Sequence, residues 1–330
     1  MPGLVDLQVN GFAGVDFLGA SAADHARAGE ALLAAGVTAY QPTLITAPED
    51  VLADALRALA APPPGRPSGA PARTARVLGA QLEGPFLSPQ RLGAHPAAHR
   101  RDPDLALLER LLAAGPVATL TLAPELPGAH ELIRHARSRG LVVGVGHTDA
   151  TAAEAHAAFD LGVSTVNHLF NAMRPFAARD PGIAGVALTR PGVVVQLIVD
   201  GRHLADEAVR LVWAAAAGRV ALVSDATAAA AAPAGGHRLG EADLAVVDGA
   251  PVRADGVLAG TTLTLLEAVR NLHALGVPFA DAVGAATAVP ARVLGRADVG
   301  VLEVGSRADV LVLDDRLELV SAQATAAVAP

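Results

Sequence analysis

Residues 142–173, VVGVGHTDATAAEAHAAFDLGVSTVNHLFNAM, decide the fold of this chain. An apolar run at 141–146 ends on His147, an alanine-rich helical segment follows, and a β-branched run at 163–167 ends on His168. Strand, helix and strand within about thirty residues form a βαβ unit, whose two strands are parallel and whose crossover is right-handed. Parallel neighbours end at the same edge of a sheet. The stretch therefore predicts that His147 and His168 lie side by side at the carboxyl edge, where α/β proteins bind their ligands.

Two neutral imidazoles on rigid strand ends are suited to a divalent metal ion. The alternative is that one or both histidines only pack or form hydrogen bonds, which is the more common role of a single histidine. The matched positions of His147 and His168 favour the metal.

Six further apolar runs, each followed by a helical pattern or a loop, bring the candidate strands to eight. The eight lie at 4–9, 37–44, 76–82, 117–123, 141–146, 163–167, 192–199 and 220–224. Eight parallel strands with intervening helices over roughly 220 residues predict a (β/α)₈ barrel. We expect this barrel domain to span residues 1–295. A doubly wound open sheet is the alternative fold.

Signals between and after the strands predict the remaining elements. Ser21 can cap a helix near 21–35, and the proline- and glycine-rich segment 62–71 is expected to be a flexible surface loop. Asp-Gly pairs predict short hairpins near 237–258, inserted after the eighth strand.

Two helices are expected beyond the hairpins. Thr261 and Thr262 can cap the first of them, which ends near residue 274, and the second covers 279–286. Residues 305–313 then read as a turn and a strand outside the barrel.

The composition is that of a folded chain with a large core. Of its 330 residues, 52% are hydrophobic and 18% are charged, and the net charge is -8 without a basic run. Disorder and a nucleic-acid partner are therefore not expected. No apolar segment of membrane-spanning length and no signal peptide is present, so we expect no membrane partner and a cytoplasmic location.

Two residue types are absent from the chain. There is no cysteine, which excludes disulfides, thiolate ligands and a cysteine nucleophile. All 25 basic residues are arginine, so no lysine can form a Schiff base or, once carbamylated, bridge a pair of metal ions.

A carboxylate ends the third predicted strand. Glu83 stands there, before a turn-forming Gly84-Pro85 pair. With His147 and His168 it would be the third ligand of a metal ion. Two histidines and one carboxylate leave a coordination position open, which is typical of a catalytic site. The alternative is a carboxylate that caps the following loop.

A second carboxylate, Asp225, ends the eighth predicted strand and faces the same mouth of the barrel. Beside a metal ion that lowers the pKa of its bound water, an aspartate can act as general base. The alternatives are a fourth metal ligand or a loop anchor.

Other polar residues fall on the loops that follow the strands. They are His95, Asn171, Arg179 and His203. An arginine, a histidine and backbone N–H groups at a turn are suited to a phosphate or carboxylate group. Histidines inside helical patterns are expected to be surface or packing residues: His25, His130, His135, His156 and His273.

An ordered set of motifs carries a family resemblance over nearly the whole chain. The motifs are LEGPFLSP, GAH, APE, VGHTDAT, NHLFNAM, PGIAGVAL, DGRHL, SDATAA and LAGTTLTL. Together they resemble the N-acetylglucosamine-6-phosphate deacetylases of the amidohydrolase superfamily. The resemblance implies a hydrolase of amino sugar metabolism that converts N-acetyl-D-glucosamine 6-phosphate to D-glucosamine 6-phosphate and acetate, with metal-bound water as nucleophile.

The resemblance also assigns roles. Glu83, His147 and His168 would hold the metal, Asp225 would be the catalytic general base and acid, and His95 would position and polarise the acetyl carbonyl. In substrate binding, His95 would contact the acetyl group. The phosphate would be bound by Asn171, Ala172, Arg179 and His203. The sugar would be lined by Leu258, Ala259 and Gly260. Family dimers can lend such an arginine across the interface, so a homodimer with Arg179 serving the neighbouring site is expected.

The chain departs from many amidohydrolases at the end of the first strand. There they carry His-x-His for a second metal ion, whereas this chain has Gln8 and Asn10. The resemblance then implies one divalent ion per subunit, with zinc expected and iron or another divalent ion as alternatives.

Relatives usually begin some tens of residues earlier, with most of a small β-sandwich. Residues 296–330 are expected to be the C-terminal part of that domain, without its N-terminal part; a misassigned start is the alternative. Two other functions remain open: deacetylation of a galactosamine or unphosphorylated analogue, and sugar-phosphate binding without catalysis.

Overall fold

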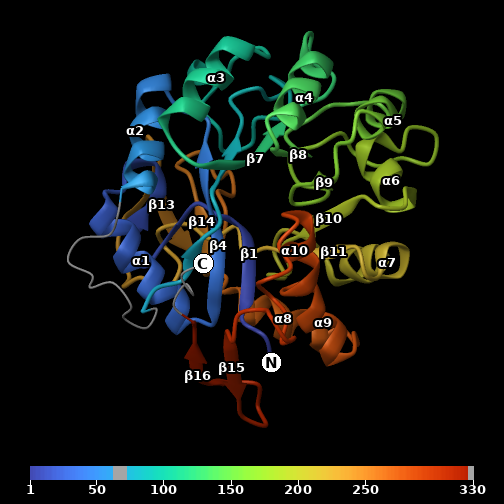
Figure 1. The fold of residues 1–330 in the computed structure, drawn as a ribbon. Helices are drawn as coiled ribbons and strands as arrows, with labels where there is room; N and C mark the ends of the chain where they lie inside the picture. The colour runs from blue at the N-terminus through green and yellow to red at the C-terminus, as the bar shows by residue number, and fades with distance from the viewer. Residues whose placement is uncertain (62–72, 326–330) are drawn as a thin grey trace.

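Eight parallel strands form a nearly closed barrel in the computed structural model, which describes residues 1–61 and 73–325 (Figure 1). In barrel order these strands are β1 (Leu4–Val9), β4 (Val37–Ile45), β6 (Ala80–Glu83), β7 (Val117–Leu122), β8 (Val142–Val145), β9 (Thr165–Val166), β10 (Val194–Leu197) and β11 (Val220–Leu222). The ring closes just beyond β11, where Ala226 forms a parallel bridge with Val9. The predicted (β/α)₈ barrel is therefore confirmed, and the open sheet is wrong. The predicted linker at 62–71 lies outside the described residues.

Most predicted strands differ from the observed ones by one to four residues, and at two of them the backbone shows the reason. The run at 76–82 is divided into β5 (Arg76–Val77), which pairs with β4, and β6. Gly79, between them, has a φ of 88°, a left-handed conformation that interrupts the extended chain. The run at 163–167 is reduced to the two residues of β9, because the chain turns into its loop directly after Asn167.

Helices surround the ring of strands in Figure 1. They are α1 (Ala22–Ala34), α2 (Glu49–Ala60), α3 (Leu105–Ala114), α4 (Ala129–Ser138), α5 (Ala152–Asp160), α6 (Gly182–Thr189), α7 (Asp206–Ala216), α8 (Leu265–Ala274), α9 (Phe279–Ala285) and α10 (Ala288–Val293), with short 3₁₀ turns at η1 (Phe17–Gly19) and η2 (Ala97–His99). Ser21 caps α1 as predicted: its hydroxyl accepts from the backbone N–H of Asp24. Within the described residues, no helix is long and apolar enough to cross a membrane.

The predicted cap of α8 is wrong. Thr264 caps this helix, in a reciprocal arrangement with Glu267. The two threonines expected there are engaged elsewhere: the Thr261 hydroxyl donates to the Ser224 carbonyl at 2.7 Å, and the Thr262 hydroxyl to the Gly249 carbonyl at 2.6 Å.

The barrel interior beneath the carboxyl edge is polar rather than apolar. Buried amides and hydroxyls fill it: Gln8, Gln41, Gln81, Gln196, Asn167, Thr119, Thr121 and Thr165. They pair with one another; Gln41 and Thr119, for example, lie 3.1 Å apart. The apolar core lies mainly between the strands and the surrounding helices. A polar interior of this kind can orient the polar groups at the mouth above it.

Among the described residues, three small antiparallel sheets lie outside the barrel. Strands β2 (Gly11–Phe12) and β3 (Val15–Asp16) follow β1 directly. Within the region of predicted hairpins, β12 (His237–Leu239), β13 (Ala242–Val247) and β14 (Ala250–Val252) form a three-stranded sheet. The third sheet pairs β15 (Val310–Leu313) with β16 (Leu319–Gln323) near the N-terminus (Figure 1). The domain boundary near residue 295 stays a prediction.

Candidate active site

His147 and His168 lie at matched positions on neighbouring strands. Val145 of β8 pairs with Val166 of β9, and each histidine lies two residues beyond that pair. Because the two histidines lie the same number of residues beyond this pair, their side chains lie at the same height at the barrel mouth. Their ring centroids are 4.9 Å apart, and both residues are buried.

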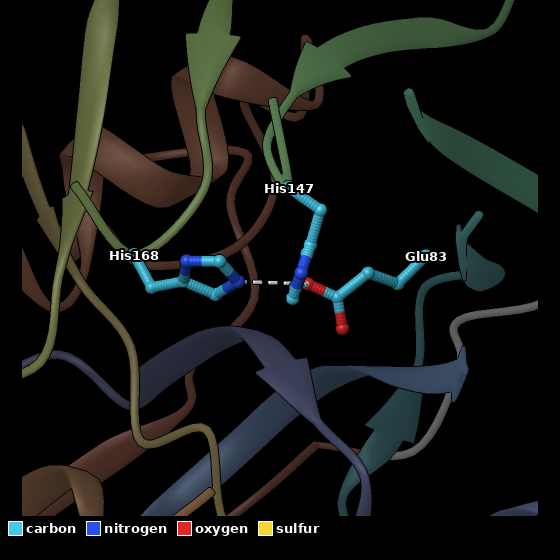
Figure 2. Close-up of side chains that lie close together, drawn as sticks. All are labelled: Glu83, His147 and His168. Atoms are coloured by element: carbon cyan, nitrogen blue, oxygen red, sulfur yellow. Dashed lines mark hydrogen bonds and ion pairs between the residues drawn. The ribbon is translucent and has the colours of Figure 1, made fainter. Parts of the chain in front are cut away.

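Glu83, the last residue of β6, extends its carboxylate toward both histidines (Figure 2). Its Oε1 lies 2.9 Å from Nε2 of His168 and 3.3 Å from Nε2 of His147. One ligand atom from each of the three residues lies within 4.8 Å of the other two, and all three residues are buried. Two imidazoles and one carboxylate form the donor set expected of a catalytic zinc site.

The hydrogen bonding of His147 is consistent with a bound cation. Nδ1 lies 2.9 Å from the backbone carbonyl of Arg91, which can only accept, so Nδ1 carries the hydrogen and Nε2 directs a lone pair toward Glu83. Burial, followed by the neighbouring His95, lowers the pKa of His147 to about 4, so the ring is neutral at pH 7. A lone pair and a carboxylate oxygen that face each other at 3.3 Å repel unless a cation binds both. The residues therefore fit a divalent ion.

Glu83 is ionised in this arrangement. Burial by itself would raise its pKa, but the surrounding histidines outweigh burial and hold the pKa of this carboxyl well below its usual range. Burial would likewise lower the pKa of His168, but the hydrogen bond to Glu83 and its charge raise that pKa instead. The site therefore concentrates negative charge on one buried carboxylate.

Gln8 and Asn10 donate to the two carboxylates of the site. Gln8 Nε2 donates to Oε1 of Glu83 at 3.0 Å, and Asn10 Nδ2 donates to Oδ1 of Asp225 at 2.7 Å. Asn167 donates in turn to Oε1 of Gln8 at 3.4 Å. Both carboxylates of the site thus accept a hydrogen bond from a neutral amide at the end of β1.

Asp225 follows β11 and lines the same cavity as Glu83, His147 and His168. Its backbone N–H donates to the Gln8 carbonyl at 2.9 Å, which fixes it against the end of β1. Burial, and then the negative charge of Glu83, raises the pKa of Asp225 to about 6. A carboxyl with a pKa near neutrality can both take and return a proton.

His147, His168 and Asp225 all have left-handed backbone conformations, with φ values of 48°, 23° and 49°. Positive φ is uncommon for residues other than glycine and is concentrated at functional sites. The sharp turn that ends each strand directs these side chains into the mouth of the barrel.

His203 is fixed by a carboxylate on its own loop. Its Nδ1 lies 2.7 Å from Oδ2 of Asp200, and Oδ1 of Asp200 accepts from the backbone N–H of Arg202 and of His203. Burial would raise the pKa of Asp200, but the hydrogen bond and charge of His203 outweigh it and lower the pKa to about 2. Asp200 is therefore a stable anion that orients the imidazole.

These groups surround a cavity of about 290 Å³. Ten of the residues predicted for the site line it: Glu83, His95, His147, His168, Asn171, Ala172, His203, Asp225, Leu258 and Gly260. Two predicted residues do not line it. Ala259 is fully buried, and its N–H donates to the Pro251 carbonyl; Arg179 is exposed on the loop between the bridged residues Ala177 and Asp180.

Sequence reasoning missed several contributors. Ile45, Ile198, Leu239 and Val257 supply apolar walls of the cavity, whereas Thr46, Arg91 and Asp200 hold its histidines. Arg91 acts through its backbone carbonyl, which no residue pattern reveals. Asp200 could have been found, because one ring nitrogen of a histidine is often bonded to a carboxylate, and Asp200 stands only three residues before His203.

Comparison with known proteins agrees with this fold. The model of the amidohydrolase family matches residues 1–329, and the chain therefore belongs to the amidohydrolase family. It is 38% identical to human "N-acetylglucosamine-6-phosphate deacetylase", over 96% of this chain and 80% of that protein. It is 36% identical to an "N-acetylgalactosamine-6-phosphate deacetylase" of Escherichia coli O157:H7, over 96% of this chain and 84% of that protein.

A solved structure extends the similarity to three dimensions. The N-acetyl-D-glucosamine-6-phosphate deacetylase of Mycobacterium smegmatis, solved as a mutant in complex with N-acetyl-D-glucosamine-6-phosphate, is 36% identical and superposes with a TM-score of 0.89. The match covers 98% of this chain and 84% of that one.

Proposed function

We propose that this protein is a metal-dependent deacetylase, which hydrolyses the acetamide of N-acetyl-D-glucosamine 6-phosphate to D-glucosamine 6-phosphate and acetate. The observation that carries the proposal is the convergence of Glu83, His147 and His168 beside Asp225 in one cavity. The similarity to deacetylases named for this substrate supports the choice of substrate.

Glu83, His147 and His168 would hold one divalent ion, which activates water and polarises the acetyl carbonyl when it is bound. We expect zinc because two imidazoles and a carboxylate are common zinc ligands; iron or another divalent ion is the alternative. Gln8 and Asn10 support a single ion, because their N–H groups are directed at the carboxylates that would hold a second one.

Asp225 is the proposed general base and acid. It accepts a proton from the attacking water as the oxygen bonds to the acetyl carbon, and it returns a proton to the amide nitrogen as the C–N bond breaks. The products are acetate and the free amine. His95 is proposed to stabilise the negative charge that develops on the acetyl oxygen.

The phosphate is proposed to bind where β9 and β10 open into their loops. His203, held by Asp200, and the backbone around Ala172 lie there, while Leu258 and Gly260 line the sugar side. Asn171 shapes this loop, since its amide donates to the carbonyls of His168 and Leu169 at 3.2 and 3.3 Å. Arg179 is proposed to reach the corresponding loop of a second protomer in a homodimer. The cytoplasmic location stays a prediction.

Acetate release by the purified protein tests the proposal. With one equivalent of Zn²⁺, we expect turnover of N-acetyl-D-glucosamine 6-phosphate that a chelator abolishes and fresh metal restores. Absence of acetate release at any metal loading would refute it.

The galactosamine isomer deserves a parallel assay, because one similar protein is named for it. A higher kcat/KM for N-acetyl-D-galactosamine 6-phosphate would select that alternative. The unphosphorylated sugar should show a much higher KM if the phosphate is bound as proposed. Tight binding of the phosphosugar without hydrolysis would instead indicate a non-catalytic binding protein.

A further inference from the structure

Three histidines, not two, surround Glu83. Besides the two proposed ligands, His95 places its Nε2 3.6 Å from Oε2 of Glu83, and its ring centroid lies 4.3 Å from that of His147. His95 is buried and lines the same cavity. By residue type and distance alone it could be another metal ligand. Its hydrogen bonds on the opposite side of the ring decide otherwise.

The two neighbouring histidines, His95 and His147, have backbone partners of opposite character. Nδ1 of His147 meets the carbonyl of Arg91, an acceptor, so the Nε2 of that ring carries a lone pair. Nδ1 of His95 instead accepts from the backbone N–H of Thr46 at 3.2 Å, and the Thr46 hydroxyl lies 2.9 Å away. An amide N–H can only donate, so Nδ1 of His95 must hold the lone pair. The neutral ring then carries its hydrogen on Nε2.

We propose that Thr46 is a positioning residue that fixes His95 in the Nε2–H tautomer. Its cavity-facing nitrogen is thereby a hydrogen-bond donor to the acetyl oxygen, and it has no lone pair with which to bind the metal. The proposal rests on the deacetylase function for the identity of the acceptor, but the tautomer follows from the hydrogen bonds alone. A donor oriented before the reaction needs no rearrangement as charge develops on the oxygen.

The sequence around Thr46 and Glu83 makes room for this contact. Thr46 follows the last residue of β4, is buried, and neighbours the end of β6 because Ile45 pairs with Glu83. Gly84 follows Glu83 in the sequence and has a φ of 88°. A Cβ at this position would lie 2.4 Å from the Thr46 hydroxyl oxygen. Glycine at 84 therefore gives the hydroxyl the space it needs to face His95.

Side-chain ¹⁵N NMR of histidine-labelled protein, with and without Zn²⁺, tests the tautomer directly. His95 is assigned by its loss in His95→Gln. We expect a protonated Nε2 and an unprotonated Nδ1 on His95, with the Nε2 shift characteristic of an N–H in both states. The Nε2 resonances of His147 and His168 should move on zinc addition. A proton on Nδ1 of His95, or coordination of its Nε2 by zinc, would overturn the proposal.

Two variants of Thr46 test its positioning role. Thr46→Val keeps the shape and removes the hydroxyl, whereas Thr46→Ser keeps the hydroxyl. Loss of one neutral hydrogen bond predicts a kcat about fivefold lower for the valine variant. KM and the zinc content should stay unchanged, and the serine variant should retain most of the wild-type kcat. Equal kcat in both variants, or loss of zinc with the hydroxyl, would contradict the positioning role.

The two measurements separate this inference from the proposed function. The NMR experiment requires no turnover. If His95 shows the expected tautomer but the protein releases no acetate, the deacetylase function is refuted and the tautomer inference stands. An active deacetylase whose His95 carries its hydrogen on Nδ1 would refute the inference alone.

Discussion

At the scale of single residues, the chemistry of the site depends on which atoms of each side chain already form hydrogen bonds. Asn10 donates to Oδ1 of Asp225, and the buried position raises the pKa of that carboxyl to about 6. The carboxylate is thus oriented, and its pKa lies close to neutral pH. Both properties suit a group that first takes a proton and then returns it.

Replacement of Asp225 by Asn should remove this proton transfer and leave the fold intact. An amide has nearly the same shape but cannot accept the proton of water, so we expect kcat for acetate release to fall by about 10²- to 10⁴-fold. Zinc content and the circular dichroism spectrum should be unchanged. Asp54→Asn, at a carboxyl that is 76% exposed, is the matched control. Near-normal turnover in the Asp225 variant would exclude it as the base.

Asp200→Asn tests how His203 is oriented. The backbone donors of Arg202 and His203 can still bond to the remaining carbonyl oxygen, but an amide NH₂ would face Nδ1 of His203 in place of the carboxylate. Loss of a charged hydrogen bond predicts a KM for the phosphorylated substrate at least about tenfold higher. Steady-state kinetics with and without the 6-phosphate measure this, because KM for the unphosphorylated sugar should change little. An equal rise for both sugars would place His203 away from the phosphate.

The sequence reveals functional side chains better than it reveals their partners. The convergence of Glu83, His147 and His168 could be predicted because each stands at the end of an apolar run, and parallel strands share an edge. Arg91 could not, because it acts through a backbone carbonyl that every residue has. Thr46 could not, because no pattern in the sequence shows that its backbone N–H and hydroxyl face an imidazole. Only the folded chain determines which N–H or carbonyl faces which imidazole.

At the scale of elements, the β12–β14 sheet covers one side of the cavity. Leu239, at the end of β12, lines the cavity, and so do Val257 and Leu258 after β14. Several hydrogen bonds hold this cover in place. Two of them are the N–H of Gly240, which donates to Asp16 at 2.7 Å, and Arg253, which donates to the carbonyl of Ala94 at 3.1 Å. The second contact joins the cover to the loop that carries His95.

Arg253→Met should loosen this cover. The methionine retains much of the aliphatic stem but cannot donate to Ala94, so we expect KM to rise about fivefold, as for the loss of one hydrogen bond. Steady-state kinetics at fixed zinc measure the change. Arg238→Met on the same sheet is the control, since Arg238 is largely exposed and lies 3.6 Å from its nearest carboxylate, Asp243. Identical kinetics for the two variants would mean that the Arg253 contact does not hold the cover.

Element boundaries were predictable only where local signals were unique. Near the start of α1, Ser21 is the only serine or threonine in the sequence, and it caps this helix. Near α8 three threonines compete, and the choice of Thr264 depends on tertiary partners that occupy the other two. The division of the third strand likewise follows from the backbone of Gly79, which the apolar run conceals.

At the scale of the whole molecule, the order of the eight apolar runs was sufficient to predict the barrel. The contents of its interior were not predictable in the same way, because alternate residues of a strand buried on both faces leave no periodic signal. Asp6 illustrates this: it lies in a run of buried residues, yet its Oδ1 joins β1 to the chain after β11 by accepting from the backbone N–H of Ser224 at 3.2 Å. It also accepts from the N–H of Gln8 at 3.3 Å.

This closing contact makes the stability of the barrel depend on pH. Burial raises the pKa of Asp6 to about 7 from 3.8, and the hydrogen bonds from Ser224 and Gln8 only partly oppose it. The folded protein therefore binds this proton more tightly than the unfolded chain does. Asp6 costs no stability below about pH 4, and its cost grows as the pH rises to about 7, where it reaches at most about 4 kcal/mol.

Asp6→Asn should remove that cost, because the amide keeps the acceptor oxygen and is neutral at every pH. Relative to the wild type, the free energy of unfolding of the variant should therefore increase between pH 4.5 and pH 8, by about 1 kcal/mol or more. Urea unfolding at several pH values measures the difference, with Asp54→Asn as the control for the change in net charge. A difference that stays constant over this range would show that Asp6 is ionised to the same extent in the folded and unfolded chains, and that the barrel closes on a carboxylate rather than on a carboxylic acid.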